Sequence, residues 1–253
     1  MSPKDTRLAG RRALVTGSTG GLGVAIAKAL AAEGAVVVVS GRDKTRGDAV
    51  VADIRSAGGD ATFVAADLGA GGDAARRLAD AATEAAGGLD ILVNNAATLL
   101  MPTPTADVSE QELRDVFGVN VFAPFLLTGV LAPRMVDHGG GAIVNIGSIT
   151  GLRGSSGSAV YSANKAAIHS FTQSWADEYG PHGVRVNAVA PGPIGTERQA
   201  EFADHIAPTL SRLPSRRVST PEEVAAAVVF LVSDTAANIH GTVLSVDGGW
   251  AAT

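Results

Sequence analysis

Cysteine is absent from the 253 residues, so the chain has no disulfide, no thiolate metal ligand and no thiol nucleophile. Aromatic residues are scarce as well, at 4%, which leaves Ala, Val, Leu and Ile to build the core. Together these two absences exclude cysteine chemistry and predict an aliphatic interior. No metal site is predicted from the remaining residues.

Basic clusters are missing too. The formal charge is −5 and no run of Lys or Arg is longer than two, so a basic face for binding nucleic acid is not expected. We see no apolar stretch near the roughly 18 residues of a membrane span. The polar start of the chain does not resemble a signal peptide. We therefore expect a cytoplasmic protein without a membrane or nucleic acid partner.

Short aliphatic strands and helical segments alternate along the chain. Strands are predicted at residues 12–16, 35–40, 61–66, 89–93, 141–146, 184–190 and 242–246, and helices at 24–33, 43–57, 72–86, 109–137, 159–180 and from Pro221 onward, with a bend at Pro124. Neither a composition break nor a long linker interrupts the pattern. It predicts one α/β domain over residues 1–253, a Rossmann-type doubly wound fold with a seven-stranded parallel sheet flanked by helices on both faces.

Polar or turn residues follow several of the predicted strands. Asp67, Asn94, Ser148 and Pro191 each stand at or just after a strand end. In an open parallel sheet, ligands bind beyond the carboxyl ends of the strands, where the strand order reverses. We therefore expect these residues to converge on one crevice.

A glycine-rich turn lies between the first strand and the first helix. In Gly17-x-x-x-Gly21-x-Gly23, missing Cβ atoms would let backbone N–H groups and a helix N-terminus approach a pyrophosphate. A tight turn without a ligand is the alternative, but the strand before it and the helix after it favour dinucleotide binding over the turn at residues 16–23.

Tyr161 and Lys165 are four residues apart in a predicted helix, so their side chains share one face. An ammonium beside a phenol favours the phenolate, and we expect Lys165 to pull the pKa of Tyr161 down from its usual value of about 10. Tyr161 is therefore a candidate proton donor and acceptor. Such a pair is more often a surface pair without chemistry, and Ser148, thirteen residues earlier, favours the catalytic interpretation.

Together these motifs resemble the classical short-chain dehydrogenase/reductase family, in the branch of 3-oxoacyl-[acyl-carrier-protein] reductases. The match extends over essentially the whole chain, with the family's order and spacing. It consists of residues 16–23, Asp67, residues 94–96, Asn120, Ser148, Tyr161 with Lys165, Pro191-Gly192 with Thr196, and residues 246–249. One departure is Ala97, where the family usually has glycine.

The resemblance implies a catalytic set of Asn120, Ser148, Tyr161 and Lys165. Tyr161 would be the general acid in ketone reduction and the general base in alcohol oxidation, Lys165 would lower its pKa and bind the nicotinamide ribose, and Ser148 would hold the substrate oxygen. Asn120 would anchor a water. The cofactor-binding residues implied are Gly17, Ser18, Thr19, Gly21, Leu22, Gly23, Arg42, Asp67, Leu68, Asn94, Ala96, Tyr161, Lys165, Pro191, Gly192, Ile194 and Thr196.

Structural interpretations remain open for three of these residues: Asn120 as a polar interruption of a helix, Ser148 as a helix cap or turn residue, and Asp67 as a turn residue at a strand end.

The coenzyme is decided mainly after the second strand. Relatives that use NAD usually carry an aspartate at the position of Gly41, whereas Arg42 follows here and can pair with a 2′-phosphate. We therefore favour NADP(H), with NAD(H) possible because Asp43 is close and Gly20 replaces a basic residue of many NADP-dependent relatives. Arg42 as a solvated surface residue is the alternative.

Substrate choice is expected to lie in residues 98–105, 149–160 and a substrate loop at about 194–218. The loop carries Arg198, His205, Arg212, Arg216 and Arg217, which would suit an acidic or phosphorylated group unless they are merely solvated or face another subunit. The resemblance further implies a homotetramer or homodimer and a small carbonyl or alcohol substrate. An NAD-dependent alcohol or sugar dehydrogenase and a non-catalytic dinucleotide-binding regulatory protein are the alternatives.

Overall fold

The computed structural model describes residues 6–154, 156–197, 210–211 and 213–252. Its seven strands, in chain order, are β1 (Arg12–Val15), β2 (Val36–Gly41), β3 (Asp60–Ala65), β4 (Ile91–Asn94), β5 (Gly141–Ile146), β6 (Val184–Pro191) and β7 (Val243–Val246). They form one parallel sheet in the spatial order β3-β2-β1-β4-β5-β6-β7. The predicted strands are confirmed, and the strand order reverses between β1 and β4.

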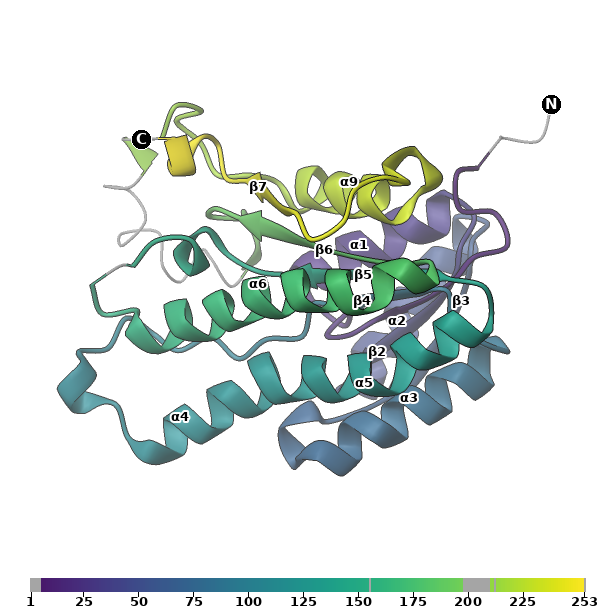
Figure 1. Ribbon diagram of the computed structural model, residues 1–253, viewed down its shortest axis with the longest axis horizontal. Coiled ribbons are helices and arrows are strands. Elements are labelled where there is room, and N and C mark those ends of the chain that lie inside the picture. Colours follow the sequence, from purple (N-terminus) through teal and green to yellow (C-terminus); the bar gives the residue numbers. More distant parts are fainter. Residues whose placement is uncertain (1–5, 155, 198–209, 212, 253) are drawn as a thin grey trace.

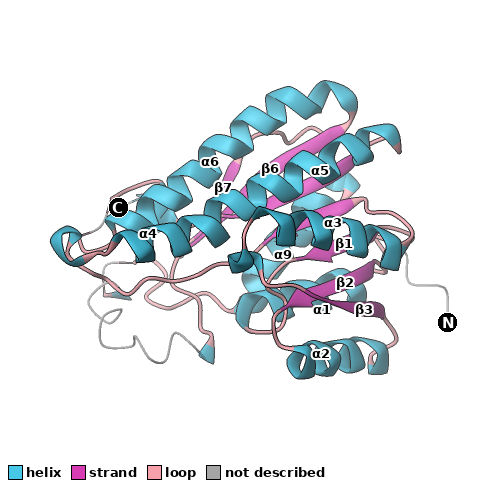
Figure 2. Ribbon diagram, turned by 90° about the horizontal axis from the view of Figure 1, so that it is seen from below, coloured by secondary structure: helices cyan, strands magenta, loops and turns pink. Residues whose placement is uncertain are grey.

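Helices cover both faces of this sheet (Figures 1 and 2). One face is covered by α1 (Gly21–Ala32), α2 (Lys44–Ser56) and α9 (Pro221–Val232), and the other by α3 (Gly72–Ala86), α5 (Ala123–Asp137) and α6 (Ala159–Tyr179), with α4 (Glu110–Phe117) leading into α5. Each face holds its own aliphatic cluster, one around Ile26 and Leu30 and the other around Leu78 and Leu127. The expected doubly wound α/β architecture is confirmed.

The irregularity in the long helix lies earlier than the predicted bend at Pro124. Residues 118–122 form a π-helical segment between α4 and α5, and Pro124 follows it in the first turn of α5. The physical reason is the proline itself: it has no N–H to donate to the carbonyl of Asn120, and its ring clashes with that carbonyl in a regular helix. Asn120 therefore lies in the irregular segment, and its carbonyl lacks the usual α-helical donor.

We expected no stretch with the length and apolar composition of a membrane span, and this expectation was wrong. The continuous helical segment Glu110–Asp137 is long and apolar enough to pass that test. Half of its most apolar window is buried inside the fold, where Leu127 and Leu131 pack in the core. A core helix that packs against a sheet can have the same composition as a membrane span.

Arg185 on β6 closes the C-terminal end of α9. Its guanidinium donates hydrogen bonds to the carbonyl oxygens of Leu231, Val232, Ser233 and Ala236. Leu231 and Val232 are in the last turn of α9, where carbonyls have no N–H donor from their own helix, and the negative end of the helix dipole favours a cation there. Burial lowers the pKa of Arg185.

Replacing Arg185 with methionine is expected to lower the free energy of unfolding by about 2–4 kcal/mol, because several half-buried carbonyls lose their donor at once. Urea denaturation measures the change. Arg76→Met is the matched control: its exposed pair with Asp73 is worth under about 1 kcal/mol. Equal effects of the two substitutions would show that Arg185 does not hold α9.

Candidate functional site

The turn between β1 and α1 is shaped by close backbone approaches. Gly17 has φ 63°, and a Cβ on it would lie 2.7 Å from the Cα of Ala96. A Cβ on Gly23 would lie 2.3 Å from the carbonyl oxygen of Gly17. The N-cap residue of α1 is Gly20, which has no side chain with which to cap the helix N-terminus. These features fit a turn that presents backbone N–H groups to an anionic group such as a pyrophosphate.

Asn95 fastens this turn to the end of β4. Its amide nitrogen donates to the carbonyls of Thr16 (2.8 Å) and Gly17 (3.1 Å), while Thr16 Oγ1 accepts from the backbone N–H groups of Asn95 and Ala96. Ala96 therefore lies beside the glycine turn, as expected of a cofactor-binding residue. Asn95 was missing from the predicted site residues, although it lies inside the 94–96 motif.

The side chain of Asn94 points into the protein rather than into the crevice. Its amide nitrogen donates to Asn145 Oδ1 on β5 (2.9 Å) and lies 3.5 Å from Thr128 Oγ1, and the residue is buried. Any contact of Asn94 with a dinucleotide would therefore come from its backbone. Its cofactor-binding role stays a prediction.

Ser18 and Thr19 join the glycine turn to the end of β2. Ser18 is buried, and its hydroxyl donates to Val15 and accepts from the backbone N–H of Ser40. Thr19 lies against Gly41, where a Cβ would meet its Oγ1 at 2.6 Å. The position that carries aspartate in NAD-dependent relatives is therefore crowded by Thr19.

The charges after β2 are mostly paired. Asp43 caps α2 by accepting from the backbone N–H of Arg46, and it forms an ion pair with the Arg46 side chain. Lys44 pairs with Asp48. Arg42 is exposed and makes no ion pair within the described part of the chain.

The remaining predicted cofactor residues lie along the same edge of the sheet. Asp67 caps the short turn after β3 by accepting from the backbone N–H of Gly69, so its role towards adenine stays a prediction. Thr196 reaches the glycine turn, 3.7 Å from the position of a Cβ on Gly21. Leu22 and Leu68 are buried below the edge, Pro191 ends β6 ahead of Gly192, and Ile194 forms a β-bridge with Ser219.

Ser148 follows β5 and is nearly buried. Its Oγ accepts from the backbone N–H and the hydroxyl of Thr150, at 3.2 and 3.0 Å. Both acceptor positions of the hydroxyl are thus in use, and its own proton is left to donate. Ser148 is a turn residue, as the alternative interpretation had it, and this turn leaves it suited to binding a substrate oxygen.

Lys165 brings Tyr161 and the end of β5 together. Its side chain is 4% exposed, Nζ donates to the carbonyl of Ile146 (2.8 Å), and Nζ lies 5.7 Å from the centre of the Tyr161 ring. Burial lowers the pKa of Lys165 to about 8. An ammonium has three N–H donors, so two remain for other partners.

Asn120 connects α6, which carries Tyr161 and Lys165, to the loop after β4. Its amide oxygen accepts from the N–H of Thr98 (2.7 Å), and its nitrogen donates to the Thr98 carbonyl (2.9 Å) and to Asn164 Oδ1 (3.2 Å). Ala97, in this loop, does not adopt a positive φ, so alanine in place of glycine introduces no left-handed strain there. The four predicted catalytic residues thus belong to one connected region.

The predicted substrate loop at about 194–218 falls partly outside the described residues, and Arg198, His205 and Arg212 are among the residues that are not described. Arg216 has φ 56°, and Arg217 forms an ion pair with Glu223, whose pKa Arg217 lowers to about 2. The charge of Arg217 is therefore already balanced within the protein.

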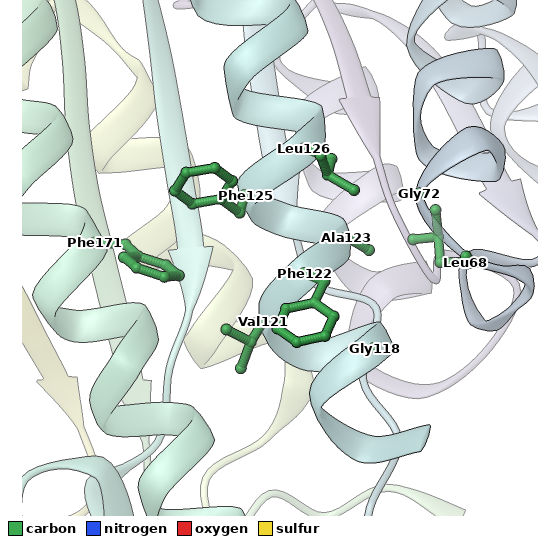
Figure 3. Close-up of a pocket in the computed structure, with 10 residues that line it drawn as sticks. Leu68, Gly72, Gly118, Val121, Phe122, Ala123, Phe125, Leu126 and Phe171 are labelled. Atoms are coloured by element: carbon green, nitrogen blue, oxygen red, sulfur yellow. The ribbon is translucent and has the colours of Figure 1, made fainter. Parts of the chain in front are cut away.

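An apolar hollow of about 390 Å³ lies between α5 and its neighbours (Figure 3). Phe122 and Phe125 on one side of it, Phe171 on α6 and Leu68 contribute carbon surface. None of the four catalytic candidates lines this hollow, so it offers hydrocarbon contact but no group for acid–base chemistry.

Comparisons with known proteins agree with this geometry. Residues 17–251 match the family model described as enoyl-(acyl carrier protein) reductase. The chain is 38% identical over 245 residues to a 2,5-dichloro-2,5-cyclohexadiene-1,4-diol dehydrogenase of Sphingobium indicum, covering 96% of this chain and 97% of that one. It is 39% identical over 246 residues to a 3-oxoacyl-[acyl-carrier-protein] reductase of Synechocystis, covering 96% and 98%.

A solved structure from Beutenbergia cavernae is also similar. It is described as a putative NAD(P) dependent gluconate 5-dehydrogenase with bound NADP at low occupancy. It superposes with a TM-score of 0.93 at 38% identity, over 98% of this chain and 100% of that one.

Proposed function

We propose that this chain, which belongs to the short-chain dehydrogenase/reductase family, interconverts a ketone and a secondary alcohol with NADP(H), using Tyr161 as the general acid and base. Membership makes the chain an oxidoreductase that acts on CH–OH groups and binds a nicotinamide dinucleotide. The coenzyme preference and the roles of individual residues are the proposal.

The observation that carries the proposal is the burial of Lys165 between Tyr161 and the strand that leads to Ser148. A buried ammonium destabilises the fold unless hydrogen bonds or an opposite charge replace its lost water. Among the described residues Lys165 Nζ donates one hydrogen bond, to the Ile146 carbonyl, which leaves two donors for a ligand. An ammonium beside the ring of Tyr161 would stabilise the phenolate that forms when the hydroxyl gives up its proton. A protein that only binds a dinucleotide could use Lys165 to hold the ribose, but it would have no need of a proton donor such as Tyr161 beside it.

In the reducing direction, the residues divide the work as follows. The Ser148 hydroxyl donates its remaining proton in a hydrogen bond to the carbonyl oxygen, and Tyr161 transfers a proton to the same oxygen as negative charge develops on it. Lys165 stabilises the resulting phenolate. A reduced nicotinamide coenzyme, when bound, would supply the hydride that the carbonyl carbon accepts, so that one hydride and one proton would convert the ketone to the alcohol.

The preference for NADP(H) rests on the end of β2. Asp43 and Lys44 are engaged with neighbouring side chains, and the position of Gly41 is crowded by Thr19. Arg42 is left as an exposed guanidinium suited to a 2′-phosphate.

Arg42→Ala is expected to lower kcat/KM with NADPH about 10- to 100-fold, the effect of losing a charge-assisted hydrogen bond. The value with NADH should change less than about two-fold. Steady-state kinetics with both coenzymes measure the difference. Lys44→Ala removes a neighbouring cation that is already paired with Asp48 and serves as the control. A similar loss of kcat/KM with NADPH in both variants would show that the general positive charge after β2 matters and not a specific contact of Arg42.

Exposed apolar side chains in the two loops expected to wall the substrate pocket favour a hydrocarbon substrate over a sugar. Leu99 and Met101 lie in the loop after β4 and Leu152 in the loop after β5, and all three are exposed. The two loops are joined by a hydrogen bond from Thr103 N–H to the Gly157 carbonyl. Hydroxyl groups placed against this surface would lose water without gaining partners.

A substrate panel tests the function. We expect NADPH-dependent reduction of cyclic and aliphatic ketones, oxidation of the matching alcohols, and at least ten-fold lower kcat/KM for polyhydroxylated keto acids. Higher activity on the keto acids would favour the sugar dehydrogenase alternative. Coenzyme binding without turnover on the whole panel would favour the regulatory one.

The homotetramer or homodimer stays a prediction of the family resemblance. The cytoplasmic location stays a prediction from the composition and the polar start of the chain.

A further inference from the structure

His169 lies on α6 one turn after Lys165 and has no assigned role. It is 6% exposed, and neither ring nitrogen has a hydrogen bond partner of normal geometry among the described residues. A buried polar group without a partner destabilises a fold, so its presence calls for an explanation. The His169 ring is not one of the four catalytic candidates Asn120, Ser148, Tyr161 and Lys165.

The ring occupies space that two glycines leave free. A Cβ on Gly147 would lie 2.1 Å from His169 Nε2 and 2.7 Å from Cδ2, and a Cβ on Gly151 would lie 2.7 Å from Cε1. Gly147 precedes Ser148 directly, and Gly151 follows it by three residues. The imidazole therefore contacts the loop on both sides of Ser148 and fills the gap between that loop and α6.

The ring is held in its neutral form. Burial, and then the nearby ammonium of Lys165, lower the pKa of His169 to about 4, against a smaller opposing contribution from the backbone of Gly151. Lys165 is the charged group on α6 that acts on the ring, and the contacts on the loop side are with glycine backbone. A neutral ring adds no second positive charge beside Lys165.

We propose that His169 is a positioning residue: its ring, packed between Gly147 and Gly151, sets the distance of the Ser148 loop from Lys165 and Tyr161. This inference rests on the proposed function, because it is Ser148's contact with the substrate oxygen that the ring would adjust. Ser148 would keep its hydrogen bonds to Thr150 but shift as part of the loop if the ring were removed.

The test is a double-mutant cycle. His169→Ala is expected to lower kcat about 10- to 100-fold, the effect of a displacement near 1 Å in a catalytic contact. Gly147→Ala should lower kcat similarly, because the new methyl group collides with the ring. In the double variant the methyl group fills the vacated space, so kcat should be at least ten-fold higher than the product of the two single effects predicts.

Gly151→Ala provides the matched control. Its Cβ would also lie 2.8 and 2.9 Å from the backbone carbon and oxygen of Lys165, which truncation of His169 cannot relieve. Combining it with His169→Ala should therefore give no rescue. Rescue of Gly151→Ala equal to that of Gly147→Ala would overturn the proposed packing.

Three further readouts separate positioning from general stability. The dissociation constant and the stoichiometry of NADPH binding should change less than two-fold in His169→Ala. The lower kcat would then reflect slower turnover at each site and not a smaller number of folded sites. The ratio of wild-type to variant kcat should stay constant between pH 5 and 8, since the ring is neutral throughout. Thermal unfolding of the coenzyme-free variants should show the same coupling between Gly147 and His169.

Three results would overturn the inference but leave the proposed function intact, provided that the wild type turns over. They are an unchanged kcat in His169→Ala, a loss of kcat that is matched by an equal loss of NADPH binding sites, and a ratio of wild-type to variant kcat that changes with pH around 6.5. Absence of turnover in the wild type would overturn both, even if the unfolding data showed the packing contact.

Discussion

Tyr161→Phe is expected to reduce kcat about 1,000-fold in both reaction directions, within the range that general acid–base catalysis contributes. The substitution keeps the aromatic ring that lies 5.7 Å from Lys165 Nζ and removes only the hydroxyl that carries the proton. NADPH binding, measured by coenzyme fluorescence, should weaken less than about ten-fold, the effect of losing at most one hydrogen bond to the coenzyme, because the glycine turn stays intact.

The chain provides a matched control, because its only other tyrosine is Tyr179. That residue ends α6, and burial together with Glu178 raises its pKa to about 12, so it is not suited to proton transfer near neutral pH. Tyr179→Phe should leave kcat within two-fold of wild type. If the two variants had equal activity, Tyr161 would not be the proton donor.

Lys165→Met is expected to reduce kcat about 100- to 10,000-fold and, in the free protein near neutral pH, to stabilise the fold. The catalytic loss follows from removing the cation beside the phenolate. The gain in stability follows from removing a buried ammonium whose pKa is lowered from 10.5 to about 8 by burial. A variant that is more stable and less active is typical of a residue kept for function.

The pH dependence of this stability difference has a defined sign. In the fold Lys165 loses its proton near pH 8, whereas in the unfolded chain it does so near 10.5. Between these values the unfolded state binds more protons, so the free energy of unfolding of the wild type rises with pH relative to the variant. The advantage of Lys165→Met should therefore shrink by about 3 kcal/mol between pH 7.5 and 10.5.

Denaturant unfolding at several pH values measures this change. Both proteins should carry Tyr161→Phe, so that the phenol beside Lys165 cannot titrate in this range; groups that do not interact with Lys165 then cancel in the comparison. A stability difference that does not vary with pH would show that Lys165 is not the buried cation described here.

Strands and their order of appearance could be predicted because a parallel sheet is buried on both faces. Strands of such a sheet are nearly continuous runs of apolar residues, and the four successive valines at residues 36–39 clearly indicate a strand. The glycine turn was predictable for a similar reason, since Gly17 and Gly23 leave room that no other residue type would leave. Local sequence carries both signals.

The directions of side chains at the strand ends could not be predicted in the same way. Asn94 turns inward because Asn145, 51 residues away, offers it an amide oxygen. Asp43 caps α2, a role that its nearness in sequence to the coenzyme position does not reveal. Each outcome depends on a partner or a backbone geometry that the local sequence does not specify.

The contact of His169 with the Ser148 loop was hidden for the same reason. Gly147 and Gly151 look like ordinary loop glycines in the sequence, and His169 looks like one polar residue of a helix. Only the packing of α6 against the end of β5 shows that the glycines make room for the ring. A contact in which one side chain fills the space beside two glycines depends on tertiary structure, so the local sequence does not predict it.

Transfer of deuterium from NADPH labelled at the nicotinamide C4 position tests the central claim most directly. With a cyclic ketone as acceptor, we predict that the alcohol product, analysed by mass spectrometry, carries one deuterium at the carbinol carbon. Transfer should be faster from labelled NADPH than from labelled NADH, and it should fall about 1,000-fold in Tyr161→Phe. Failure of either coenzyme to deliver deuterium to a range of apolar ketones, with both coenzymes bound, would contradict the account.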